Sequence, residues 1–157
     1  MKTWMTGLVS AVFLLSMFAV VQAREIRITN NEGGSIIRAE RHWKMVAARG
    51  DRVVIDGLCQ SACTVILGIV PRNHLCYTDR AVLGFHMAFK RPPGYQRPFG
   101  MRGFDRSNRI PDPILTKRLT RWYPAPVRRW IRRHGGLTGL DFKYMRANEM
   151  TFLKHCS

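Results

Sequence analysis

The residues of this chain whose types and spacing could do chemistry are one serine, one histidine and a pair of glycines. Ser61 lies in the run GLCQSACT at residues 57–64, His86 follows it after 25 residues, and Gly33-Gly34 precedes it by 27 residues. Acyl transfer needs a nucleophile, a general base and backbone N–H groups that bind the developing oxyanion. The three features therefore predict an acyl-transfer site with Ser61 as the nucleophile and His86 as the base.

The segment before the serine predicts a strand, a turn and a helix. Residues 25–29 alternate polar and apolar side chains as a half-buried strand does, and the turn formers of residues 30–35 end that strand. Apolar residues then recur at helical spacing from Ile36, and the helix is expected to stop at Gly50. The glycine pair thus lies in the turn between the first strand and the first helix.

The segment around the serine also predicts a strand followed by a helix. Residues 52–56 are β-branched and predict a second strand, and residues 62–69 are apolar nearly all round, as in a buried helix. Residues 75–77 and 81–86 supply two more strands. The order βαβαββ predicts a single α/β domain with a mainly parallel sheet and flanking helices.

Each candidate residue also has a simpler interpretation. Ser61 is placed to cap the helix over residues 62–69, which is a common position for serine. His86 ends an apolar strand, where a buried histidine can be held by backbone carbonyls. The joint arrangement favours chemistry, because the glycine turn, the serine and the histidine follow different strands and meet at one edge of a parallel sheet.

The second half of the chain predicts a loop and three helices. Residues 90–111 contain four prolines, three glycines and six Lys/Arg against one acid, which forbids a regular element. Apolar residues mark helices near residues 114–122 and 127–131, the latter ended by Gly135-Gly136, and a final helix over residues 144–153.

With these motifs the chain resembles the Clp-type proteolytic subunits of the crotonase-like superfamily, and more closely a group of small exported Clp-like proteins. The resemblance covers nearly all of residues 24–157. Its motifs are the glycine turn at residues 31–35, the serine elbow at 57–64, the strand pair ending in histidine at 74–86 and the segment 147–150. It implies a crotonase/Clp-like core.

The resemblance also implies roles for individual residues. Ser61 is the nucleophile, His86 is the general base, and the N–H groups of Gly34 and Ala62 form the oxyanion hole. The family has an aspartate as third member, and the nearest carboxylate to the corresponding position, which is near Thr138, is Asp141. Either Asp141 substitutes, or a carbonyl or water orients the histidine, or the site is inactive.

Residues 1–23 are predicted to be a signal peptide. Lys2 gives a positive start, residues 7–21 are an apolar run too short for a stable span, and Ala23 provides a small residue at a cleavage site. An uncleaved N-terminal anchor is the alternative. Either way residues 24–157, enough for one compact domain, are expected to be exported to the periplasm or secreted.

Four cysteines in an exported chain predict two disulfides. Cys63–Cys76 is the preferred pair because 13 residues separate its members across one short helix, and Cys59–Cys156 would tie down the C-terminus. A zinc site is the alternative, but the chain lacks a CxxC pair, so no metal or other cofactor is expected.

The chain is strongly basic, with 26 Lys+Arg against 10 Asp+Glu and a formal net charge of +16. Such a surface binds polyanions, and for an exported protein these are membrane phosphates or acidic polysaccharide rather than nucleic acid. Seven cations and no acid lie between residues 117 and 134. Aromatic residues interleave with basic ones in the 90–111 loop, as in single-strand nucleic-acid platforms, but export disfavours that partner.

Two functions are therefore expected from the sequence. The first is an exported serine hydrolase or peptidase that acts on a peptide or acyl substrate. The second is a catalytically inactive Clp-like module that binds an anionic envelope surface, with Ser61 and His86 in structural roles. The sequence leaves the oligomeric state open.

Overall fold

The computed structural model describes residues 23–95 and 108–156. The predicted signal peptide, apart from its last residue, and the centre of the predicted loop lie outside the described residues. The described strands are β1 (Glu25–Asn31), β2 (Arg52–Gln60), β3 (Leu75–Tyr77), β4 (Val82–Phe85), β5 (Phe89–Lys90), β6 (Ile110–Pro111), β7 (Lys143–Arg146) and β8 (Lys154–His155). The α-helices are α1 (Ile36–Ala48), α2 (Ile66–Ile69), α3 (Pro113–Thr120) and α4 (Ala125–Arg133), and the 3-10 helices are η1 (Ser61–Val65), η2 (Arg72–His74) and η3 (Ala147–Glu149).

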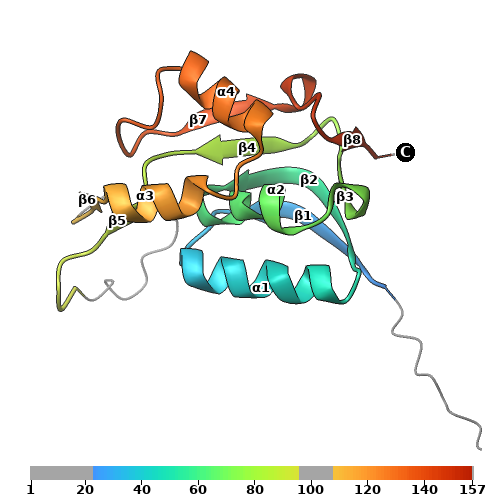
Figure 1. The fold of residues 1–157 in the computed structure, drawn as a ribbon, viewed down its shortest axis with the longest axis horizontal. Helices are drawn as coiled ribbons and strands as arrows, with labels where there is room; N and C mark the ends of the chain where they lie inside the picture. Colours follow the sequence, from blue (N-terminus) through green and yellow to red (C-terminus); the bar gives the residue numbers. More distant parts are fainter. Residues whose placement is uncertain (1–22, 96–107, 157) are drawn as a thin grey trace, which may run out of the picture.

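The main sheet is built around β2. This strand pairs in parallel with β1, with β3 through its first half and with β4 through its second half. β3 pairs in parallel with β8, whereas β4 pairs antiparallel with β7. Figure 1 shows a curled sheet, with α1 beside β1 at one edge, α4 beside β7 at the other, and η1 and α2 between them. The predicted mixed α/β fold with a mainly parallel sheet and flanking helices is confirmed.

One face of the sheet forms the hydrophobic core with the helices. Because side chains alternate along a strand, Val53 and Ile55 point into the core, and Asp56 points to the opposite face. The core residues contributed by β4, α1 and α4 are Leu83, Phe85, Trp43, Val46, Val127, Trp130 and Ile131. On the opposite face the Asp56 carboxylate binds the guanidinium groups of Arg27 and Arg80.

The predicted elements of the first half are confirmed within a few residues. Ser35 caps α1 by accepting from the Arg38 N–H, and β2 runs further than expected, as far as Gln60. This extension depends on Gly57, because a Cβ there would overlap the Thr29 carbonyl at the irregularity in the β1–β2 pairing. The buried helix expected over residues 62–69 consists of η1 followed by α2.

The final helix expected over residues 144–153 is wrong. This segment forms β7, η3 and β8 instead. Met145 pairs with Leu83 on the free edge of β4, so backbone pairing with the sheet replaces the helical hydrogen bonds. Met150 and Leu153 are still buried, as their apolar spacing suggested.

The predicted disulfide pairing is also wrong, although two disulfides are present. Cys59 is bonded to Cys63 with Cα atoms 5.4 Å apart, and Cys76 is bonded to Cys156 with Cα atoms 5.2 Å apart. The chain reverses at the end of β2, which brings Cys63 back to Cys59. β8 lies beside β3, which brings Cys156 to Cys76. Two disulfides indicate an oxidising, non-cytoplasmic location.

Among the described residues no helix combines the length and the apolar character that crossing a membrane requires.

Candidate active site

Ser61 occupies a strained corner between β2 and η1. Its φ of +57° is in the left-handed region, which is uncommon for a residue with a side chain and costs roughly 1–3 kcal/mol. The N-cap of η1 is Gln60, so the interpretation of Ser61 as the helix cap is wrong. Strained residues of this kind cluster at functional sites, where surrounding contacts maintain them.

Three contacts maintain the corner. The Thr64 hydroxyl donates to the Ser61 carbonyl at 2.6 Å and lies 2.8 Å from the Tyr123 hydroxyl. Tyr123, in the segment that connects α3 to α4, is fully buried, and burial raises the pKa of its hydroxyl, so it stays protonated. The Cys59–Cys63 disulfide spans the corner from the strand side to the helix side.

The glycine turn lies directly against the serine. Gly33 has a φ of +90°, and a Cβ on it would come within 2.6 Å of the Ser61 Cβ and 2.8 Å of the Ala62 nitrogen. Only glycine therefore fits at this position. The turn and the backbone amide that follows the serine are thus neighbours, although they belong to different strand ends.

His86 meets Ser61 from the next strand of the sheet. Gln60 at the end of β2 pairs with Gly84 of β4, so the residues that follow each strand lie at the same edge. The His86 Nε2 atom is 2.7 Å from the Ser61 Oγ atom, and both side chains are buried. The sequence-based expectation that these two residues meet is confirmed.

The imidazole of His86 is held in its neutral form. Burial is the largest cause that lowers its pKa to about 4, and the nearby positive charge of Arg109 adds to the lowering. Hydrogen bonding at the Met87 backbone acts in the opposite direction. At neutral pH the ring is therefore unprotonated and able to accept a proton from the serine hydroxyl.

The loop before β7 packs against the imidazole ring of His86. The Phe142 ring centroid lies 4.5 Å from that of His86, and the Met87 N–H donates to the Gly139 carbonyl at 2.9 Å. Asp141 lies in this loop with an exposed side chain. Its predicted part in a triad stays a prediction.

Ser61, His86 and Gly34 line one cleft of about 770 Å³. Its other walls come from the glycine turn, the first turn of α1, the β5 region and α3. The remaining lining residues include Glu32, Ser35, Ile36, Ile37, Arg38, Ala88, Phe89, Arg91, Tyr95, Arg109, Leu115 and Leu119. The cleft is thus apolar on its helical side and basic at several points of its rim.

A buried carboxylate fixes two walls of this cleft relative to each other. Glu40 of α1 accepts from Arg118 of α3 at 2.6 and 3.1 Å and from the Trp122 indole at 3.0 Å. The hydrogen bonds from Arg118 are the main cause that lowers the pKa of Glu40 to about 2. The pair is therefore ionised at neutral pH and ties α3 to α1.

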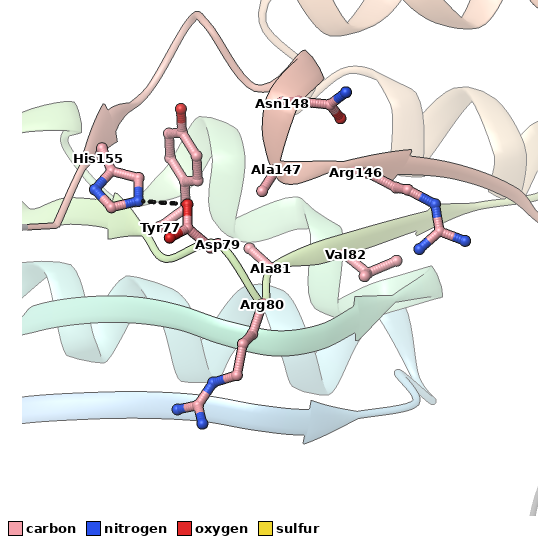
Figure 2. A pocket seen from close by; sticks show the side chains of 9 residues that line it. All are labelled: Tyr77, Asp79, Arg80, Ala81, Val82, Arg146, Ala147, Asn148 and His155. Atoms are coloured by element: carbon pink, nitrogen blue, oxygen red, sulfur yellow. Dashed lines mark hydrogen bonds and ion pairs between the residues drawn. The ribbon is translucent and has the colours of Figure 1, made fainter.

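A second hollow of about 730 Å³ lies where β4 begins, at the opposite end of that strand from His86. Figure 2 shows the hydrogen bond between His155 and Asp79 on one side of it, with the side chains of Arg80 and Arg146 extending away. Its polar groups do not converge on a common point. None of the sequence-predicted catalytic or oxyanion-hole residues lines it.

Sequence reasoning missed several residues that shape the site. Thr64 had a signal, because it follows the serine by one helical turn and can bond back to its carbonyl. Tyr123, Phe142 and Arg109 had no such signal, since each is far from residues 57–64 in the sequence and reaches the site only through the fold.

Among the described residues no group of three or more His, Cys, Asp or Glu side chains is arranged to hold a metal ion.

Comparison of the chain with protein-family models, with curated proteins and with solved structures gave no match. The assignment of a function therefore depends on the geometry of the site.

Proposed function

We propose that this protein is an exported serine hydrolase or peptidase in which Ser61 and His86 act as the catalytic pair. The observation that carries the proposal is the 2.7 Å contact between the Ser61 Oγ atom and the His86 Nε2 atom in a cleft. The strained backbone at Ser61 also favours chemistry over a structural role, and the low pKa of the imidazole leaves it unprotonated at neutral pH, as a general base requires.

The proposed reaction is acyl transfer in two stages. The Ser61 hydroxyl gives its proton to the His86 Nε2 atom while its oxygen attacks the substrate carbonyl. His86 then passes this proton to the leaving amine or alcohol, which departs as the acyl ester forms on the serine. A water molecule, deprotonated by His86, cleaves the ester to release a carboxylic acid, and the proton returns to the serine oxygen.

The oxyanion of each tetrahedral intermediate would be bound by the N–H groups of Gly34 and Ala62. The close approach of Gly33 to the Ser61 Cβ atom and the Ala62 nitrogen supports this assignment, because it places the two backbone segments together at the nucleophile. A pair of such donors stabilises the transition state by several kcal/mol. The same arrangement supports kinship with the Clp-type subunits of the crotonase-like superfamily, which is part of this proposal.

The test is active-site labelling of purified mature protein with a neutral, fluorescent fluorophosphonate. We expect labelling of the native protein and of a Thr151→Ala control, and none of Ser61→Ala. Thr151 is the control because it is exposed and its substitution removes a hydroxyl outside the cleft. Failure of the folded native protein to react, or equal reaction of Ser61→Ala, would overturn the proposal.

The second candidate function is binding to an anionic envelope surface, and the exposed arginines of α4 favour it. Val127, Trp130 and Ile131 face the core, so Arg128, Arg129, Arg132 and Arg133 fall on the outer side of the helix and are exposed. The Arg128 guanidinium donates to the Tyr123 carbonyl. The other three arginines form the surface proposed to bind an anionic membrane, named here the α4 arginine surface.

A further inference from the structure

The rim of the Ser61–His86 cleft carries more positive than negative charge. Arg38, Arg91 and Arg109 line it, and Glu32 is the one carboxylate among its described lining residues. The three arginines come from three parts of the chain: Arg38 from α1, Arg91 from the segment after β5, and Arg109 from the segment before β6. The fold therefore brings Arg38 of α1 together with Arg91 and Arg109, which belong to the two ends of the basic 90–111 segment.

Two of these arginines are stacked on aromatic rings. The guanidinium carbon of Arg109 lies 4.2 Å from the Phe89 ring centroid, and that of Arg91 lies 4.2 Å from the Tyr95 ring centroid. The Phe89 ring in turn lies 5.9 Å from the His86 ring. The Arg109 guanidinium and the catalytic imidazole are thus both neighbours of the Phe89 ring, and stacking holds the charge in place near the reacting atoms.

One part of the cleft wall, formed by α1 and α3, is aliphatic. Ile36 and Ile37 of α1 face the cleft together with Leu115 and Leu119 of α3. Half of the Ile37 side chain is exposed, at 51%, which leaves apolar surface for a substrate to cover. A bound molecule would gain by placing a hydrocarbon segment on this wall and an anionic group near the stacked arginines.

Building on the proposed hydrolase function, we propose that the cleft selects acyl substrates whose acyl part carries a negative charge beyond a short hydrocarbon segment. Arg109 is the main specificity-determining residue, and Arg38 and Arg91 contribute to the positive rim. The acyl group of a peptide with an acidic side chain and that of a dicarboxylic acid ester share this chemistry. The hydrocarbon segment lies on Ile37 and Leu115, and the scissile carbonyl lies at Ser61.

The test compares two esters that differ only in charge. The 4-nitrophenyl monoester of adipic acid carries a carboxylate, and the corresponding ester of its monoamide is neutral and nearly isosteric. We expect kcat/KM for the acid to exceed that for the amide by about tenfold or more at about 0.05 M salt, and the ratio to fall at about 0.5 M salt. A ratio near one, or one that favours the amide, would overturn the inference.

Single substitutions test whether the preference for the charged ester arises in the cleft. Arg109→Gln should lower the acid-to-amide ratio by about fivefold or more, while Arg109→Lys, which keeps the charge, should retain most of it. At about pH 8 the His86 base is neutral in every variant, so a change in its pKa does not alter the ratio. Arg38→Gln is a second variant, on the exposed side of α1, and should lower the ratio without affecting folding.

Arg72→Gln is the matched control, since it removes the same charge at the far end of β2. It should leave the ratio unchanged, and an equal loss with this variant would attribute the preference to overall charge and overturn the inference. An acidic and a neutral fluoromethyl ketone peptide extend the comparison from esters to peptides. Labelling of Ser61 by the neutral fluorophosphonate reports on the proposed function alone, so a labelled enzyme without charge preference refutes only the specificity.

Discussion

His86 determines how the site should respond to pH. The base must be unprotonated to accept the Ser61 proton, and burial, with the charge of Arg109, lowers its pKa to about 4. The rate of Ser61 labelling should therefore rise with pH through about 4 and stay level from about 5 to 8. Labelling measured over this range by fluorescence, with circular dichroism as a check on folding, tests this expectation.

An exposed histidine would instead give a midpoint near its ordinary pKa of about 6.5. A midpoint at that value would contradict the structural environment of His86.

The same pKa shift affects the stability of the fold. Because the unfolded chain binds the proton more readily than the folded one, this histidine's contribution to the free energy of unfolding should fall as the pH drops from about 6.5 towards 4.

Substitution of Asp141 distinguishes a Ser61–His86–Asp141 triad from a Ser61–His86 dyad. Its side chain is exposed, whereas His86 is buried and already supported by Phe142 and the Met87 backbone. We therefore expect Asp141→Asn to change the labelling rate by less than about threefold. Asp79→Asn, exposed at the second hollow, is the control. A loss greater than about tenfold with Asp141→Asn alone would assign the aspartate to a triad.

At the scale of elements, the sequence predicted the positions of Ser61 and His86 because each follows a strand with a clear β-branched or apolar pattern. Strands that are parallel and adjacent bring their ends to one edge, so linear order was sufficient. The final segment was mispredicted for the opposite reason. The spacing of Met145, Met150 and Leu153 suits a helix, but the free edge of β4 takes Met145 into a strand.

The disulfide pairing was not predictable for a related reason. Cys59 and Cys63 meet only because the chain turns sharply at Ser61, and Cys156 meets Cys76 only because β8 pairs with β3. The first pair depends on a local backbone corner and the second on pairing between distant strands, and spacing along the chain encodes neither. The cleft arginines were hidden in the same way, because Arg38 and Arg109 lie far apart in the sequence and meet at the rim.

The two disulfides should have separable effects. Cys76–Cys156 closes a loop with a sequence separation of 80, which in the chain-entropy account stabilises the fold by about 4–5 kcal/mol. Cys59–Cys63 has a separation of 4 and should contribute only about 2 kcal/mol by this account, but it spans the corner at Ser61. Its main effect is therefore expected on the geometry of Ser61.

Paired alanine variants test this separation. Cys76→Ala with Cys156→Ala should lower the melting temperature more, while the folded protein keeps its reactivity with fluorophosphonate. Cys59→Ala with Cys63→Ala should lower the melting temperature less and reduce labelling of Ser61 by about tenfold or more, because the strained φ is less well maintained. If both pairs reduced labelling equally at a temperature where both variants are folded, the disulfide at the corner would have no special role.

At the scale of the whole molecule, the charge of +16 raises the question of whether one surface or the total charge binds anionic membranes. The outward arginines of α4 lie at helical spacing on one side, so they can contact a flat surface together. If the α4 arginine surface binds a membrane, affinity for vesicles containing phosphatidylglycerol should fall steeply between about 0.05 and 0.3 M salt. Sedimentation with vesicles of phosphatidylglycerol and phosphatidylcholine measures this.

Two charge-matched double variants separate the alternatives. Arg129→Glu with Arg133→Glu changes the α4 arginine surface but keeps Arg128, which donates to the Tyr123 carbonyl and so supports the fold. Arg72→Glu with Lys154→Glu makes the same change in net charge at exposed positions away from α4. We expect the first pair to lower vesicle affinity by about tenfold or more and the second by less than about threefold, with Ser61 labelling intact in both. Equal losses would assign binding to the total charge, because long-range attraction depends on net charge whereas a docked surface depends on where the cations lie.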